Sequence, residues 1–157
     1  GDVPEHGVAA GFDDYLAGHA RGIESFCRPE NGARLGASGV RYTGVCPAHL
    51  EGAFLDAYAE SYGLYERQAT VDALRRQIRA RRARSNEIEH LLVDRTARLV
   101  SPLLTPAERA SLAVELKQLT DEKIELEASI PRLERDCEQA ERDYESYRDQ
   151  LAMRDVG

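Results

Sequence analysis

Two cysteines and two histidines are the residues of this chain whose types and spacing offer the clearest chemistry. Cys27 and Cys46 enclose a glycine-containing segment, and His19 and His49 lie on either side of it. Thiolates and imidazoles are preferred zinc ligands, and the Cys-x-x-His spacing of Cys46 and His49 is compatible with a zinc site. However, His19 and Cys27 are eight residues apart and the set has no second short pair. Zinc binding is therefore one alternative among several for these residues.

Polar side chains in and just before the segment 27–46 are candidates for binding a ligand or a partner. The segment holds four of the twelve glycines of the chain and the turn signal Asn31-Gly32. Segments of this kind, held on a rigid scaffold, often carry function. The candidate binding residues are Arg21, Glu30, Asn31, Arg34 and Tyr42.

No arrangement of catalytic residues is recognisable. The sequence contains no phosphate-binding glycine loop, no nucleophile elbow and no His-Glu-x-x-His motif. Asp13 and Asp14 are adjacent, so they diverge on a helix and more plausibly serve its first turn than an acid–base pair. The sequence therefore predicts a protein that is not an enzyme and that uses no cofactor.

The composition is that of an elongated helical protein rather than a compact globule. The 157 residues include 31% charged residues, three Phe and no Trp, which suits a large surface for a small volume. A formal net charge of −7 argues against a nucleic-acid partner, because proteins that bind nucleic acids usually carry a basic face. No apolar run reaches about 18 residues, so no membrane-spanning helix is predicted.

The charges are arranged in blocks that predict helix pairing. Residues 67–98 contain nine Arg and four acidic residues, a balance of +5. Residues 99–157 contain eight basic and fourteen acidic residues, a balance of −6, and residues 1–66 contain four basic and ten acidic residues, also −6. A basic helix beside an acidic one has a preferred orientation. The alternative, that the arginines bind nucleic acid or an anionic membrane, is less favoured because the complementary acid lies in the same chain.

Apolar residues repeat at spacings of four and three toward the C-terminus, which is the heptad pattern of a coiled coil. A looser version of the pattern precedes it. Between the two, Pro102 ends one helix, and Thr105 and Glu108 form a capping box that starts another at Pro106. Equal arms joined by a short turn at 101–105 predict an antiparallel hairpin. The seam of the second arm is Leu112, Leu116, Leu119, Leu126, Ile130, Leu133, Cys137, Ala140, Tyr144, Tyr147 and Leu151.

Folding the arms about this turn predicts their register. It places Leu126 beside Ile78 and Lys123 near Arg81, a polar layer within the apolar seam. It also gathers five tyrosines at the base of the hairpin. These are Tyr58, Tyr62, Tyr65, Tyr144 and Tyr147.

The domain organisation predicted from these patterns is a small head at residues 1–66 and a coiled-coil hairpin at residues 67–157. The head is expected to hold one helix, a glycine-rich loop and the start of the long helix. The fold class is all-α.

Within the head, residues 12–26 carry an apolar stripe at helical spacing. Gly18 and Gly22 share a face of that helix and predict the close approach of another helix. A turn at Glu30-Asn31-Gly32 follows, and Pro47 occupies a position at which a long helix can begin.

The head also carries a specific series of residues. The series is Tyr15-Leu16-Ala17-Gly18, Cys27, Pro29-Glu30-Asn31-Gly32, Leu35-Gly36, Gly39, Tyr42, Gly44-Val45-Cys46-Pro47, Leu50-Glu51, Phe54 and Tyr58, with the turn Leu104-Thr105-Pro106-Ala107-Glu108-Arg109 farther on. With these residues the chain resembles a family of bacterial envelope lipoproteins known only as a domain of unknown function. The resemblance implies exposure to the periplasm and attachment to the outer membrane through a lipid on a cysteine upstream of Gly1. It implies no enzymatic activity.

In an oxidising periplasm, Cys27 and Cys46 are expected to form a disulfide, with zinc binding and free thiols as the remaining alternatives. Cys137 lies on the seam and is expected to be a small buried core residue. The function favoured is that of a structural or protein–protein interaction module with a protein partner in the envelope, and with possible self-association through the coiled coil. The alternative is a module that binds a small ligand or peptide through the segment 27–46, such as an inhibitor or an immunity-type protein.

Overall fold

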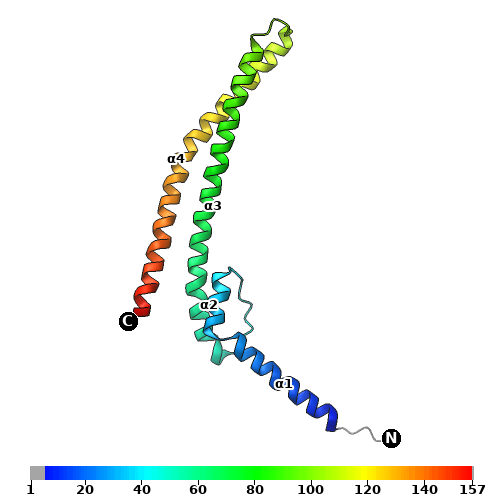
Figure 1. Ribbon diagram of the computed structural model, residues 1–157, viewed down its shortest axis with the longest axis vertical. Coiled ribbons are helices and arrows are strands. Elements are labelled where there is room, and N and C mark those ends of the chain that lie inside the picture. Colours follow the sequence, from blue (N-terminus) through cyan, green and yellow to red (C-terminus); the bar gives the residue numbers. More distant parts are fainter. Residues whose placement is uncertain (1–5, 157) are drawn as a thin grey trace, which may run out of the picture. The chain divides into compact units, whose positions relative to one another are not determined.

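The computed structural model describes residues 6–156, and within this range the chain is entirely α-helical and coil (Figure 1). The predicted all-α class, with a disulfide and a long helical hairpin, is confirmed. None of the described helices combines the length and the apolarity needed to span a bilayer. The helices are α1 (His6–Phe26), α2 (Pro29–Ala37), α3 (Ala48–Leu99) and α4 (Pro106–Val156).

The described residues form two compact units. The first, which we call the head, contains the chain up to Arg67 together with the end of α4 from Ser146 onward. The second, which we call the hairpin, is Gln68–Glu145. The sequence assigned all of 67–157 to the hairpin, whereas the structure groups the last turns of α4 with the head. In the head, the Tyr147 ring lies against Gly63, and the Arg67 guanidinium stacks over the same ring at 3.9 Å from its centroid.

The hairpin consists of the later part of α3 and most of α4, and its core lies on the predicted seam. Val71, Ile78, Cys137 and Ala140 form one buried cluster. Cys137 is 6% exposed, as expected for a small core residue. Burial raises the pKa of its thiol, and the neighbouring Glu141 carboxylate adds to the rise. The thiol is thus kept neutral and unreactive as part of the core.

Ion pairs between the basic stretch of α3 and the acidic stretch of α4 confirm the pairing predicted from the charge blocks. The arginines farther along α3 pair with glutamates nearer the start of α4, as an antiparallel pair of helices requires. Each pair is partly exposed and adds little stability by itself, but together the pairs favour one orientation of the two helices. The pairs are Arg75–Glu141 (2.9 Å), Arg82–Glu134 (2.7 Å), Arg84–Glu122 (2.8 Å) and Arg95–Glu115 (2.9 Å).

The register of the hairpin differs from the prediction. Arg81 donates a hydrogen bond to the buried Ser129 hydroxyl at 2.7 Å, and Lys123 lies 3.9 Å from Glu89 instead of beside Arg81. Ile78 packs in the cluster that contains Cys137, about three turns farther along α4 than Leu126. The predicted polar layer of Lys123 and Arg81 was wrong. When one helix is shifted by seven residues along the other, the apolar pattern of the heptad repeat is unchanged, so only the paired charges distinguish one register from the next.

The turn between the arms has the predicted cap. The Glu108 amide donates to the Thr105 hydroxyl at 3.1 Å, and the Thr105 amide donates to the Glu108 carboxylate at 3.3 Å. These reciprocal bonds satisfy two donors that a helix start would otherwise leave unpaired. The Arg109 guanidinium also donates to the backbone carbonyls of Leu99 and Ser101, the first of which ends α3. The connection is therefore closed by side chains at the start of α4.

Acid should weaken the hairpin through Glu122. Its carboxylate accepts two hydrogen bonds from Arg84, which lower the pKa of Glu122 below its ordinary value of 4.5. A carboxyl group whose pKa is lowered by folding stabilises the folded state at pH values above its ordinary pKa. This contribution is lost as the pH falls through the pKa of the group in the folded state. We expect Glu122→Gln to show a smaller drop in melting temperature than wild type between about pH 6 and about pH 3.

The matched control for this prediction is Glu125→Gln, at an exposed position on the same helix. Melting temperatures measured by circular dichroism across the pH range would compare the three proteins. An identical acid sensitivity in wild type and Glu122→Gln would show that the Arg84 pair contributes nothing to the pH dependence.

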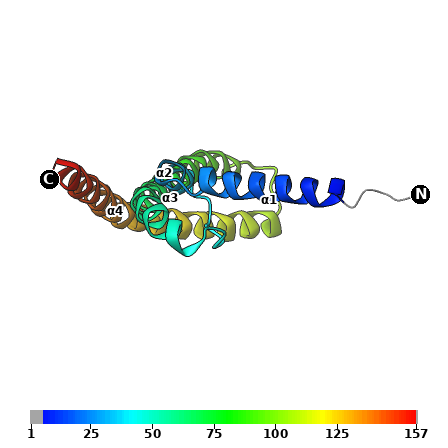
Figure 2. The same cartoon turned by 90° about the horizontal axis from the view of Figure 1, so that it is seen from below.

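The head is assembled around glycines of α2. In both views α2 lies beside the first turns of α3 (Figures 1 and 2). A Cβ on Gly32 would overlap the Phe54 carbonyl oxygen, and a Cβ on Gly36 would overlap the Tyr58 carbonyl oxygen. The two buried glycines are four residues apart, so they share one face and bring the two backbones into contact. This contact is the main packing of α2.

Two expectations about the helices of the head were wrong. The predicted turn at Glu30-Asn31-Gly32 is part of α2, which begins at Pro29, a favoured first residue of a helix. The close approach predicted at Gly18 and Gly22 is absent from the described residues, since nothing lies within 4 Å of a Cβ built on either. The pair Gly18 and Gly22 has the same spacing as the pair Gly32 and Gly36, but of these two pairs only the second is used for packing among the described residues.

Four of the five tyrosines predicted to gather at the base of the hairpin belong to the head, namely Tyr58, Tyr62, Tyr65 and Tyr147. Tyr58, Tyr62 and Tyr65 stack along α3, with centroids 5.4 Å and 6.0 Å apart. A Cβ on Gly39, which has a φ of +72°, would overlap the Tyr65 ring. This row therefore faces the segment that follows α2, whereas Tyr147 of α4 lies against Gly63.

Candidate functional site

The disulfide joins the residue after α1 to the segment that leads into α3. The Cα atoms of Cys27 and Cys46 are 5.8 Å apart, and the two residues are 2% and 6% exposed. The predicted pairing is confirmed. Because each sulfur is bonded to the other, neither is a thiolate available to zinc, and the alternatives of a zinc site with His19 and His49 and of free thiols were wrong.

An aromatic core surrounds the disulfide. Phe54 of α3 is fully buried and lies in one cluster with both cysteines. Its ring centroid is 5.8 Å from that of Phe26 and 5.1 Å from that of Tyr42. Phe54 thus contacts the end of α1 and the segment after α2 at once. The apolar core and the covalent bond hold the same three parts of the head together.

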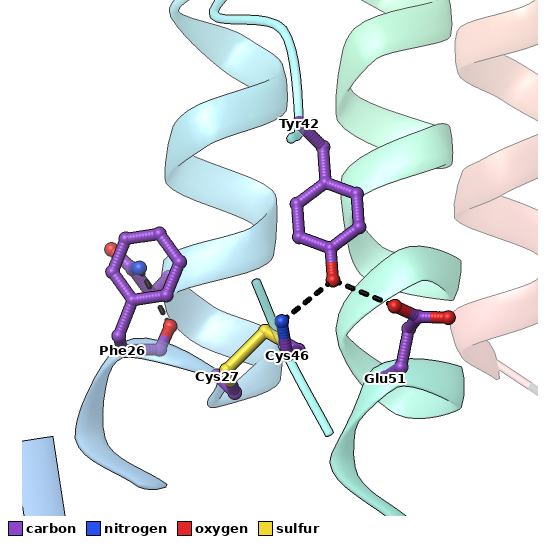
Figure 3. The surroundings of a disulfide bond; sticks show 6 residues. Phe26, Cys27, Tyr42, Cys46 and Glu51 are labelled. Carbon is purple, nitrogen blue, oxygen red and sulfur yellow. Dashed lines mark hydrogen bonds between the residues drawn. A yellow bond between two sulfur atoms is a disulfide. The ribbon is translucent and has the colours of Figure 1, made fainter. Parts of the chain in front are cut away.

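Tyr42 anchors the segment between α2 and α3 (Figure 3). Its hydroxyl donates to the Glu51 carboxylate at 2.8 Å and accepts from the Cys46 amide at 2.9 Å. Its own amide donates to the Tyr58 hydroxyl at 3.2 Å, and that hydroxyl donates to the Val40 carbonyl at 2.8 Å. Burial raises the pKa of Tyr42, and the Glu51 carboxylate adds to the rise. The phenol therefore stays protonated and able to donate.

A cleft with a volume of about 540 Å³ lies where the end of α1 meets the start of α2. Asn31 helps to shape it, because its amide donates to the Phe26 carbonyl at 2.7 Å across the junction. The backbone of Arg28 is extended (φ −70°, ψ 145°), which lets the chain change direction between the two helices. The lining residues are Gly22, Ser25, Phe26, Arg28, Glu30, Asn31 and Arg34.

A second depression, with a volume of about 400 Å³, lies beside the disulfide. It is mostly apolar, and its walls come from α1 and from the segment just before Cys46. Phe26 and Gly22 line both this groove and the cleft. The residues around the groove are His19, Gly22, Ile23, Phe26, Cys27, Thr43 and Val45.

The charged residues of the cleft differ from those of the hairpin. Within residues 6–156, the side chains of Arg28, Glu30 and Arg34 make no ion pair and no hydrogen bond, whereas four arginines of α3 are paired with acids of α4. All three are exposed. The cleft therefore offers two guanidinium groups and one carboxylate with their hydrogen-bonding capacity unused.

The structure brings together three of the five residues predicted to bind. Glu30, Asn31 and Arg34 line the cleft. Arg21 is exposed on α1 and is not among the lining residues, and Tyr42 is bound to Glu51 and Cys46 inside the head.

Sequence reasoning missed Ser25 and Arg28 in the cleft and Thr43 and Val45 in the groove. It missed the first two because it treated residues 29–37 as a turn and loop. A helix starting at Pro29 would have placed Arg28 at its N-terminal boundary, next to the predicted helix 12–26. For Thr43 and Val45 the sequence carries no comparable signal.

Comparison with known proteins gives one match. Residues 1–63 match the model of a family described as protein of unknown function (DUF2799). The match spans α1, α2, the disulfide and the first turns of α3, and it ends before the hairpin begins at Gln68. Searches of curated proteins and of solved structures found no match. The resemblance of residues 1–63 to a family of unknown function is therefore confirmed.

Proposed function

We propose that this protein is a non-enzymatic protein–protein interaction module that faces the periplasm, anchored to the outer membrane by an N-terminal lipid. The observation that carries the proposal is the cleft of unused charged groups beside an apolar groove, both on a head held by a disulfide. Interaction surfaces combine an apolar centre with charged groups that a partner can pair. A buried structural disulfide supports an oxidising compartment such as the periplasm.

The hairpin supports a structural role in the same proposal. It has a buried core of its own, and several of its arginines are paired with acids of the same hairpin, so it can serve as a scaffold. A scaffold that needs no ligand to stabilise it leaves the head free to carry recognition.

The proposal is tested by site-specific crosslinking in native cells. A photoreactive amino acid at position 34 lies in the cleft, and one at the exposed position 77 of α3 is the matched control. We expect position 34, and not position 77, to crosslink one identified envelope protein. Trapping of free thiols in the same cells should find Cys27 and Cys46 oxidised. Reduced cysteines, or crosslinks that are the same at both positions, would contradict the proposal.

A second candidate function is the binding of a small ligand or peptide, as in an inhibitor or an immunity-type protein. The volume of the cleft favours it, because about 540 Å³ lies within the usual range of small-molecule sites. Under this alternative, purified protein would bind a low-molecular-weight fraction of an envelope extract, and Arg34→Ala would lose that binding without a change in melting temperature.

A further inference from the structure

We infer that the cleft and the groove form one bipartite docking site for a polypeptide segment of the partner that carries an apolar side chain and, a few residues away, a carboxylate. The inference rests on the proposed function, since it names what the head of an interaction module recognises. It goes further by assigning the apolar side chain of the partner segment to the groove and its carboxylate to the cleft.

The groove would take the apolar side chain. Val45 is 54% exposed and Phe26 is 38% exposed, so both present apolar surface that the chain itself leaves uncovered. The wall behind them is the buried disulfide and its aromatic core, which makes the groove rigid. A rigid apolar pocket binds a matching side chain at a lower ordering cost than a flexible one.

The cleft would take the carboxylate. Arg28 and Arg34 both line it, and neither guanidinium has a partner among the described residues. Guanidinium groups bind carboxylates through paired hydrogen bonds. Ser25 adds a hydroxyl donor to the same wall. The charge complementarity therefore favours an acidic residue or a C-terminal carboxylate over a basic residue.

Gly22 makes the two halves continuous. It lines both the groove and the cleft, and nothing lies within 4 Å of a Cβ built on it. A bulky residue at this position would stand between the two halves. Gly22 also lies inside α1, where glycine is unfavourable by about 1 kcal/mol relative to alanine. An open passage between the halves accounts for a glycine that the packing of the chain does not require.

A polypeptide fits the charge pattern better than an anionic bilayer does. Glu30 lines the cleft, and the Asn31 side chain, whose amide is bound to Phe26, keeps a carbonyl oxygen that can accept. These acceptors suit the N–H groups of a peptide. A bilayer with anionic headgroups would meet the Glu30 carboxylate and the acidic balance of residues 1–66, four basic against ten acidic residues.

The test uses the whole protein and a fluorescein-labelled peptide library in which a Leu or Phe lies two to four residues from a Glu. We expect saturable binding by fluorescence anisotropy, and binding at least about tenfold weaker for Arg34→Glu. Val45→Ser should weaken binding of the Leu and Phe peptides, and Gly22→Leu should weaken binding because it blocks the passage. Arg76→Glu, at an exposed position of α3, is the matched control.

One further library and one stability measurement make the result decisive. A library with Lys in place of Glu should bind Arg34→Glu better than wild type, because the charges are exchanged on both sides. Gly22→Leu should melt at or above the wild-type temperature, since nothing lies within 4 Å of a Cβ at this position and leucine is a better helix former than glycine. No binding from the Glu library, or binding that Arg34→Glu leaves unchanged, would overturn the inference.

Binding to vesicles of anionic phospholipid that is lost in Arg34→Glu, without binding of any peptide, would also overturn the inference in favour of a lipid surface. If cells show a crosslink from position 34 to an envelope protein but no peptide binds, the inference fails and the proposed function stands. If the crosslink is absent as well, both fail.

Discussion

Replacing Gly36 by alanine is expected to lower the free energy of unfolding of the head by about 2–3 kcal/mol. The added Cβ would overlap the Tyr58 carbonyl oxygen and would lie 2.8 Å from the Tyr62 amide nitrogen. Both atoms belong to the backbone of α3, so no side chain can move aside. Either α2 shifts away from α3 or the contact is lost, and in both cases the packing around Phe54 is loosened.

The matched control is Gly18→Ala on α1. Nothing lies within 4 Å of a Cβ at Gly18, and alanine is the better helix former by about 1 kcal/mol, so this variant should be equally or more stable than wild type. Urea unfolding followed by tyrosine fluorescence would report on the head, whose ring contacts include Tyr42 and Tyr58. If both variants unfolded at the same urea concentration, the close packing of α2 on α3 would not exist in solution.

Removal of the disulfide by Cys27→Ala together with Cys46→Ala is expected to cost about 3 kcal/mol in the stability of the head. The bond closes a loop of 19 residues, and a loop of this length removes about that much unfolded-state entropy. The hairpin should be affected little, because the core formed by Val71, Ile78 and their neighbours contains no part of the loop. The expected outcome is thus a head that unfolds early and a hairpin that stays helical.

Circular dichroism and limited proteolysis would distinguish the two parts. In the double variant, and in wild type treated with a reductant, cleavage should appear within residues 11–46 while Gln68–Glu145 resists. The Cys137→Ala variant controls for effects of the third thiol, which reductants do not change. Uniform loss of helicity across the chain would mean that the two units do not fold independently, and unaltered stability would mean that the disulfide adds nothing to a head already held by its aromatic core.

The sequence by itself determined the parts of the fold that follow from local rules. The heptad spacing, Pro102 and the Thr105–Glu108 capping box predicted two long helices and the turn between them, and the structure has both. The opposite charge of the two arms predicted that they pair, and the short turn between arms of equal length predicted that they run antiparallel. The pairing of Cys27 with Cys46 was also predicted, with the help of a family resemblance. These features depend on spacing along the chain, which a sequence displays directly.

Only the tertiary structure decided the register of the hairpin, the helix α2 and the composition of the site. A heptad pattern is the same after every seven-residue shift, so the position of Arg81 opposite Ser129 depended on which side chains pack best. Asn31-Gly32 favours a turn locally, but Gly32 and Gly36 allow a helix to lie against the backbone of α3, and that contact outweighs the local preference. Once α2 forms, Arg28 and Arg34 line one cleft, and Tyr42 is hydrogen-bonded to Glu51 and Cys46. The cleft is lined by residues close together in the sequence, but its shape depends on α2 forming as a helix, and the packing of α2 on α3 is a tertiary contact that the local sequence does not specify.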